Sequence, residues 1–358
     1  MTDTYSNSRQ HSPDHVRKLV LAYGYHANAY QVLNPGIGHW FSSHYPAVAG
    51  YVKRGRWWLA AGAPICDPAN LLQVALEFQA AAQRHRCRVC YCFAEQPLVD
   101  CLQPLGHKVI ALGAQPVWIP AQWPHLLQTH QSLRQQIRRA GNKGVYIRTF
   151  TPAQATADMR FQDSLRLWLK HKSLAPMGFL VEPRALEAGY SDRLIWGAMQ
   201  RQGDEGEKLL AFLLSSPVPG RSGFLVEQII RHPAAPNGAV EILIDACMNA
   251  LHQRGSAYLT LGPVALSRYA TMAMAANPWW MRGLMQLTRR HLGRWYGFET
   301  LESFRARLRP NRWEPVYAIV QGCRFIPAAF YAMAGAFFRP HEVADAGGVV
   351  DGPARVPP

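Results

Sequence analysis

The sequence predicts an α/β protein with mixed β-sheets flanked by helices, built as two halves of similar element order. The chain has 358 residues, of which 49% are hydrophobic, so it can bury a core in each of two domains. Strand and helix patterns alternate from residue 47 onward, as is typical of α/β folds. A strand pair, a helix and a further strand occur in this order in each half, without a repeat of individual residues.

The first half opens with a strand pair around a turn at Gly55, over residues 48–53 and 56–61. Helical periodicity predicts a helix over 70–84, with Asn70 as its N-cap. Strand patterns follow at 88–94 and 109–119. Prolines between 116 and 124 interrupt this order. We therefore place a first unit at residues 16–125 and a second at 126–322.

The second half repeats the pattern with longer connections. Its predicted helices cover residues 132–140, 161–172 and 239–253, and the last of these is strongly amphipathic. Its predicted strands cover residues 145–150, 209–215, 223–231 and 256–261. The turn before the last helix contains Pro236, Asn237 and Gly238, which are turn-forming residue types.

Both ends of the chain differ from this pattern. Residues 1–15 are polar, residues 341–358 are rich in Gly, Pro, Ala and Val, and we expect both to be disordered. Between them and the core lies an apolar segment at 323–340, which is shorter than the ~20 apolar residues that a spanning helix needs. Two placements remain open for it: the membrane interface, with Arg324 and Arg339 on head groups, or the protein core.

The charge is strongly basic, with 38 Lys and Arg against 23 Asp and Glu, a net charge of +15. No acid occurs in residues 101–157 or 246–298. Such a surplus favours a polyanionic partner, either nucleic acid or an anionic membrane, over a protein that is simply basic.

The cysteines and the N-terminus indicate a cytoplasmic protein. Seven scattered cysteines make no disulfide framework and fit a reducing compartment. No second cysteine or histidine pair completes a zinc site around Cys90 and Cys92. The N-terminus lacks the apolar core of a signal peptide. Peripheral attachment to the inner face of the plasma membrane is compatible with these features.

Three segments contain the residues expected to do chemistry. In the first, Arg134 and Arg138 share one face of the helix at 132–140, Arg139 lies beside them, and Lys143 follows in a turn bounded by glycines. Like charges this close need a compensating anion, which RNA phosphates would supply. A solvated basic helix is the alternative.

The second segment is a strand that ends in Arg231, followed by the turn at 236–238 and a helix. Backbone N–H groups at a helix N-terminus bind phosphate. Glu227 and Glu241 lie near this turn and are candidate acids or bases, although each could instead form a local salt bridge.

The third segment covers residues 304–317. On an extended strand, Arg305, Arg307 and Arg309 would lie on one side and could bind phosphate. Trp313 could stack on a base or anchor at a lipid interface. A basic edge strand that resists aggregation is the alternative.

Together, these segments resemble the catalytic domain of the lysylphosphatidylglycerol synthase family, the aminoacyl-tRNA:phosphatidylglycerol transferases, over about residues 47–319. The most specific part runs from Arg231 through Pro236-Asn237-Gly238 to Glu241. The chain departs from the family pattern at Gln228, where the family has aspartate, and at Ala265, where it has proline. Arg305 and Arg307 stand where the family has lysines.

The resemblance implies two fused acetyltransferase-like (GNAT-type) units. It implies an aminoacyl-tRNA donor, an anionic phospholipid such as phosphatidylglycerol as acceptor, and no metal or nucleotide cofactor or covalent intermediate. The acetyltransferase coenzyme A signature is absent from the turn at 236–238. The donated amino acid and the oligomeric state stay open.

On this basis we assign roles to the residues singled out above. The catalytic candidates are Glu227, Arg231, Glu241 and Arg307; the substrate-binding candidates are Asn237, Gly238, Arg305 and Trp313; the tRNA-binding candidates are Arg134, Arg138, Arg139 and Lys143. Two other functions remain open. One is a coenzyme A or acyl-carrier-dependent acyltransferase of the same fold, and the other is a non-catalytic protein that binds membrane or RNA.

Overall fold

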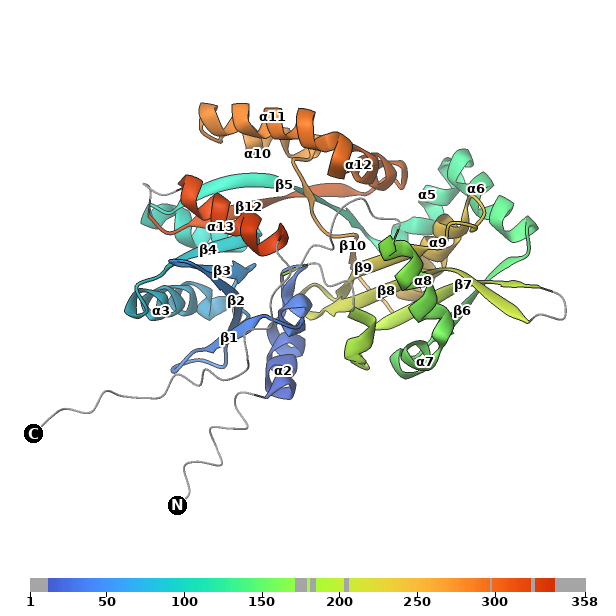
Figure 1. Cartoon of the computed structure of the whole chain (residues 1–358), viewed down its shortest axis with the longest axis horizontal. Helices are drawn as coiled ribbons and strands as arrows, with labels where there is room; N and C mark the ends of the chain where they lie inside the picture. Colours follow the sequence, from blue (N-terminus) through green and yellow to red (C-terminus); the bar gives the residue numbers. More distant parts are fainter. Residues whose placement is uncertain are drawn as a thin grey trace, which may run out of the picture.

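Strands from both halves of the chain join in one mixed sheet with helices on both faces (Figure 1). The computed structural model describes residues 12–170, 179–180, 185–202, 206–296, 298–322 and 326–338. The strand order is β1-β2-β3-β4-β12-β5-β10-β9-β8-β7-β6, with β11 paired to β5. The strands are β1 Gly38–Phe41, β2 Val48–Arg54, β3 Trp57–Ala61, β4 Arg88–Ala94, β5 Lys108–Trp118, β6 Val145–Phe150, β7 Leu194–Arg201, β8 Glu207–Val218, β9 Gly223–Arg231, β10 Tyr258–Thr260, β11 Val264–Ala265 and β12 Arg312–Val320.

The helices follow the apolar periodicity of the sequence. In α9, Leu243, Cys247 and Leu251 are buried at a spacing of four residues, which places them on the face toward the sheet. The helices are α2 Pro13–Tyr23, α3 Leu71–Arg84, α4 Gln96–Leu102, α5 Trp123–Thr129, α6 Gln131–Asn142, α7 Pro152–Ala157, α8 Met159–Lys170, α9 Ala239–Gln253, α10 Thr271–Ala275, α11 Trp279–Tyr296, α12 Phe298–Arg307 and α13 Ile326–Phe338.

The repeated element order is present in the structure. Strands β2 and β3 form an antiparallel pair, α3 crosses over, and β4 lies parallel to β3. In the second half, β8 and β9 pair antiparallel, α9 crosses over, and β10 lies parallel to β9. The prediction of an α/β fold with two similar units and mixed sheets is confirmed.

The two halves exchange strands at the centre of the sheet. Strand β12, from the end of the chain, pairs with β4 of the first half, and β5, from the first half, pairs with β10 of the second. Strands β5 and β12 also pair with each other along nearly their whole length. Each half is therefore completed by a strand of the other, although the division at residue 125 stays a prediction.

Three local expectations were wrong. Residues 305 and 307 lie in helix α12 rather than on an extended strand, because Leu308 and the half-buried Phe304 pack inward at helical spacing. Asn70 makes no side-chain cap; Asp67 instead accepts a hydrogen bond from the N–H of Ala69. Helix α2 begins at Pro13, inside the segment expected to be disordered. Residues 1–11 and 341–358 lie outside the described residues.

The apolar segment near the C-terminus forms α13 and packs on the core. Ala329, Ala332 and Ala336 are buried in the same apolar cluster as residues of β2 and β3, whereas Tyr331 is 79% exposed. One face of the helix is thus docked. No helix within the described residues has both the length and the apolar character needed to cross a bilayer.

Candidate functional site

The sheet of the second half opens where β9 and β10 diverge. The two strands pair in parallel at only three positions, from Gly223↔Tyr258 to Leu225↔Thr260. Strand β9 continues for residues 226–231 along β8, while β10 pairs on its other side with β5. Helix α9 begins shortly after β9 ends, so its N-terminus lies near this open end (Figure 1).

Glu227 lies at a β-bulge beside the divergence. The register moves from Gln228↔Leu214 to Val226↔Ser215, so Glu227 is the extra residue of β9. Both of its carboxylate oxygens accept hydrogen bonds from Arg193, at 2.9 and 3.2 Å, and the two side chains are 3% and 2% exposed. Because both oxygens are occupied by this buried ion pair, the geometry favours a positioning role for Glu227 over that of a free base.

The turn between β9 and α9 is held by its own residues. The Arg231 guanidinium donates to the carbonyl of Ala235. Gly238 has a φ of +94° and begins the helix, and a Cβ there would lie 2.1 Å from the carbonyl oxygen of Gln136 in α6. Gly238 therefore allows α6 to pack directly on the N-terminus of α9. Glu241 lies half-buried in the first turn of α9.

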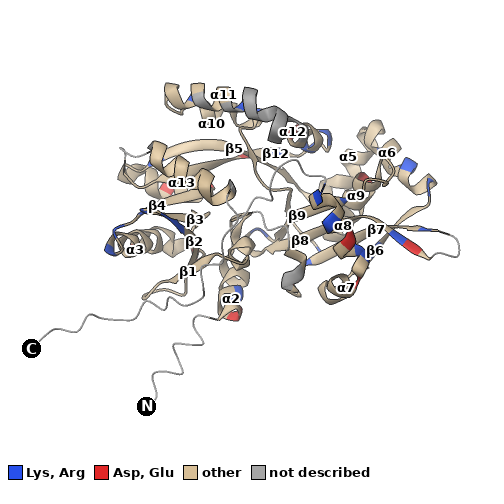
Figure 2. Cartoon of the chain, viewed as in Figure 1, with Lys and Arg blue, Asp and Glu red and all other residues tan. Residues whose placement is uncertain are grey.

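Of the four basic residues predicted to bind tRNA, one has a structural role and three are exposed. Arg134 donates to the carbonyls of Leu127 and Gln128 and thereby caps the end of α5. Arg138, Arg139 and Lys143 are exposed, and Figure 2 shows basic positions on α6. The structure thus leaves three of the four predicted cations accessible, two on α6, which packs against α9, and Lys143 directly after it.

The residues of the third segment are dispersed. Arg305 donates to the carbonyls of Gly262 and Pro263, at 2.7 and 3.0 Å, and fixes the chain where it leaves β10. Burial lowers the pKa of Arg305 to about 10. Arg307 is exposed on α12. The Trp313 ring stacks on Tyr269, with centroids 4.2 Å apart and planes at 5°, so one of its faces is already covered.

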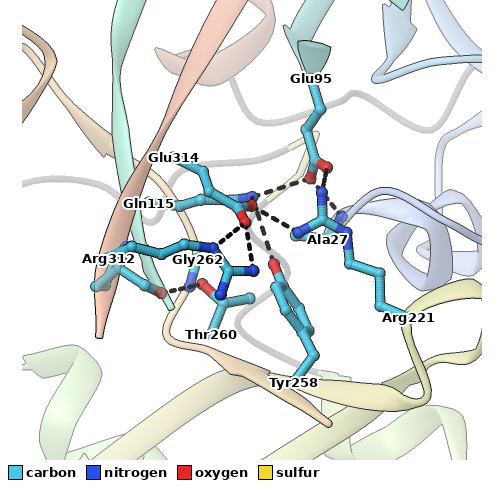
Figure 3. A network of polar contacts seen from close by, with 10 residues as sticks. Ala27, Glu95, Gln115, Arg221, Tyr258, Thr260, Gly262, Arg312 and Glu314 are labelled. Carbon is cyan, nitrogen blue, oxygen red and sulfur yellow. Dashed lines mark hydrogen bonds and ion pairs between the residues drawn. The ribbon is translucent and has the colours of Figure 1, made fainter. Parts of the chain in front are cut away.

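A buried polar network that the sequence did not predict joins the two halves at the centre of the sheet (Figure 3). Arg221, at the end of the short helix η7 (Pro219–Arg221) between β8 and β9, donates to Glu95 and to Glu314, each at 2.6 Å. Gln115 lies opposite Glu314 in the β5–β12 pair and donates to Glu95 at 3.0 Å. The rings of Tyr25 and Tyr258 lie 4.7 and 4.6 Å from the guanidinium carbon of Arg221.

The two carboxylates of this network have opposite pKa shifts. Burial raises the pKa of Glu95, and the charge of Arg221 and the hydrogen bonds from Ala27 N–H and Gln115 only partly oppose this. Burial also acts on Glu314, but the charges and hydrogen bonds of Arg221 and Arg312 outweigh it and lower the pKa. Paired carboxyl groups with divergent pKa values are common in active sites and also occur in structural ion-pair networks.

The segment after α2 covers both buried arginines. Tyr25 lies over Arg221, and Tyr30 lies over Arg193, 5.3 Å from its guanidinium carbon. The Tyr30 hydroxyl donates to Asp192 at 2.9 Å, and Asp192 also pairs with Arg17 of α2 at 2.5 Å. Sequence reasoning missed these residues because the partners lie far apart in the chain. The available signal was an acid or arginine directly beside an apolar strand, as at Glu95 after β4.

Comparison with known proteins gives a consistent picture. Residues 17–320 match the family model described as phosphatidylglycerol lysyltransferase, C-terminal. The lysylphosphatidylglycerol biosynthesis bifunctional protein LysX of Mycobacterium sp. strain KMS is 24% identical over 280 residues, or 75% of this chain and 25% of that protein. LysX of strain JLS is 24% identical over 284 residues, with the same coverage. The chain thus spans about a quarter of the length of these curated relatives.

Two solved structures share the fold. The C-terminal domain of a putative lysylphosphatidylglycerol synthetase from Agrobacterium fabrum has a TM-score of 0.73 and 20% identity, covering 93% of this chain and 98% of that one. The structure of L-PGS from Bacillus licheniformis has a TM-score of 0.74 and 18% identity, covering 90% and 96%. Together with the match over residues 17–320, these findings show that the chain belongs to the family of phosphatidylglycerol lysyltransferase C-terminal domains.

Proposed function

We propose that this protein transfers an amino acid from aminoacyl-tRNA to a hydroxyl group of an anionic phospholipid such as phosphatidylglycerol. The names of the curated relatives and the family model support the lipid acceptor. The observation that carries the tRNA donor is the placement of α6. This helix packs on the N-terminus of α9, beside the divergence of β9 and β10. Its exposed cations Arg138 and Arg139, together with Lys143 directly after it, suit a polyphosphate partner.

The reaction needs little from the protein beyond positioning and proton transfer, because the aminoacyl ester is already activated. The lipid hydroxyl oxygen attacks the ester carbonyl carbon, the bond to the ribose oxygen breaks, and the hydroxyl proton passes through a base to the ribose oxygen. Glu241 is our candidate base. Arg231 and Arg307 would hold the acceptor phosphate or the developing oxyanion, and Arg305 would hold the adjacent backbone in place.

The same geometry disfavours coenzyme A as donor. In an acetyltransferase-type site the carrier phosphates would bind at the N-terminus of α9. Here the carbonyl oxygen of Gln136 lies against Gly238 at that terminus, and a carbonyl dipole repels phosphate. Tight coenzyme A binding would contradict this part of the proposal.

The test is an in vitro transfer assay with labelled aminoacyl-tRNAs and phosphatidylglycerol, followed by lipid extraction. The double variant Arg138→Ala, Arg139→Ala should lower kcat/KM for aminoacyl-tRNA by about tenfold at moderate salt and flatten the salt dependence, because two phosphate contacts are lost. The matched control is Lys53→Ala, Arg56→Ala, which removes two exposed cations of the first half and should leave transfer unchanged.

A second variant tests the base. Glu241→Gln should lower kcat by about a hundredfold or more without changing the thermal midpoint, because proton transfer typically contributes this much. Full turnover in this variant would remove Glu241 from the mechanism. A wild-type protein that makes no aminoacyl lipid from any aminoacyl-tRNA would refute the proposed function.

A further inference from the structure

The C-terminal helices expose most of the large apolar side chains found on the described surface. Of ten such exposed residues, six lie between residues 269 and 338, which is about a fifth of the chain. Four of them form what we call the α10–α12 surface: Met272 is 91% exposed, Trp279 78%, Leu287 56% and Leu301 47%. Apolar exposure concentrated in this way indicates an interaction surface rather than scattered exposure.

Helix α11 is two-sided. Met281 and Met285 are buried toward the sheet, whereas Trp279, Gly283 and Leu287 follow one another at four-residue spacing and are exposed. The chain leading into α11 is fixed, because the buried side chain of Asn277 bonds both the N–H and the carbonyl of Ala111 in β5. Figure 1 shows α10, α11 and α12 along one side of the molecule, over β5 and β12.

The acid-free stretch of the sequence covers both α10 and α11. Residues 246–298 contain no acid, and Arg282 is exposed in α11, one helical turn from Trp279. The nearby acid Glu302 is buried and pairs with Arg268 and Arg289. The outward face therefore combines Trp, Met and Leu with arginine.

We infer that the α10–α12 surface docks on an anionic lipid bilayer and lies in its head-group boundary. This inference rests on the proposed function, since it states how the enzyme reaches a membrane-resident acceptor. Aliphatic side chains beside one Trp suit the interface between acyl chains and head groups, and the exposed Arg282 suits anionic lipid. RNA would favour several stacking rings, and a second copy of the same face would bring like charges together.

The test is flotation of the purified protein with vesicles of phosphatidylglycerol or of phosphatidylcholine. Wild-type protein should float with the anionic vesicles. The double variant Met272→Ser, Trp279→Ser should partition about tenfold or more less, because both exposed side chains lose their apolar contact. The matched control is Leu105→Ser, Met159→Ser, which changes two residues that are 52% and 61% exposed elsewhere and should bind like wild type.

Several outcomes would overturn the inference. These are absence of wild-type binding to anionic vesicles, full binding by the Met272, Trp279 variant, or a loss of binding in the control variant that equals the loss in the test variant. A fall in the mass measured by light scattering for the test variant would show that the surface joins two copies instead.

Failure of the inference and failure of the proposed function are separable. The Met272→Ser, Trp279→Ser variant should transfer the amino acid to phosphatidylglycerol dispersed in detergent. It should lose this transfer when the phosphatidylglycerol is presented in vesicles. Vesicle binding without any transfer by the wild-type protein would support the docking surface and reject the aminoacyltransferase.

Discussion

Replacing Arg221 by Met should destabilise the protein through the carboxylates it leaves behind. Arg221 is 12% exposed and bonds Glu95 and Glu314, each at 2.6 Å. Glu314 keeps Arg312 as a partner, but Glu95 is 6% exposed and retains only hydrogen bonds from neutral groups. Removing one partner of a buried ion pair costs about 3–5 kcal/mol, because the remaining charge is buried and uncompensated.

The measurement is urea denaturation followed by tryptophan fluorescence. For a chain of 358 residues, a loss of about 4 kcal/mol in the free energy of unfolding also lowers the thermal midpoint by about 5 °C, which a thermal melt would measure. The matched control is Arg166→Met, which breaks an ion pair at the surface: the Arg166 side chain is 63% exposed and that of its partner Asp163 is 58% exposed. This control should change stability by under about 0.5 kcal/mol.

A second mutation isolates the cause. In the double variant Arg221→Met, Glu95→Gln the uncompensated charge is gone, so we expect roughly half or more of the lost stability to return. The difference in stability between the wild-type protein and Arg221→Met should also become smaller as pH falls. A carboxyl with a raised pKa binds a proton more readily in the folded state, and folding then gains from acid. No recovery in the double variant and no narrowing at low pH would refute this account.

Three further predictions concern other sites. Burial lowers the pKa of His26 from 6.5 to about 4, so between these pH values the unfolded chain binds one more proton than the folded protein, and stability falls with acid. The loss in the free energy of unfolding between pH 7 and pH 5 is about 2 kcal/mol. His26→Gln should remove that part of the pH dependence, as measured by urea denaturation at each pH. In Gly238→Ala the new Cβ would clash with the carbonyl of Gln136 and the residue would keep an unfavourable positive φ, so the protein should lose about 2 kcal/mol or more of stability, and hydrogen exchange in α6 should become faster. The control is Gly106→Ala, where φ is +81° but the space is open, and it should lose about 1 kcal/mol. Asn277→Leu leaves the N–H and carbonyl of Ala111 unpaired and should cost about 2–3 kcal/mol in thermal unfolding.

Elements whose local pattern had one meaning were predictable from the sequence. Strand β4 was placed correctly because its residues from Val89 to Cys92 form a short apolar run, and α9 because its apolar residues recur at helical spacing. The segment around Arg305 was misassigned because arginines at every second position also fit a helix whose Phe304 packs inward. Alternation of charge alone does not fix the period.

The candidate site was only partly predictable, because ion pairs between distant residues depend on topology. The turn at Gly238 and the cations of α6 are local features, whereas the packing of α6 on that glycine could not be predicted from any local pattern. Glu95, Arg221 and Glu314 are separated by 126 and 93 residues and meet only because β12 inserts between β4 and β5. The pairing of Glu227 with Arg193 likewise follows from the bulge in β9.

The asymmetry between the two similar units favours the second as the place of the proposed chemistry. In the first, β3 pairs with β4 from Trp57↔Arg88 to Ala61↔Cys92, over its whole length, so no β3 backbone is left open on that side. In the second, β9 extends six residues beyond its last pair with β10. At the first residue of β10, the Tyr258 hydroxyl accepts a hydrogen bond from Gln115 of β5, and the Tyr258 ring packs against Arg221. After the last residue of β10, Arg305 donates to the carbonyl of Gly262. The opening is therefore held from both ends of β10, and such a fixed opening would suit the proposed transfer, in which an activated ester is positioned against a hydroxyl group.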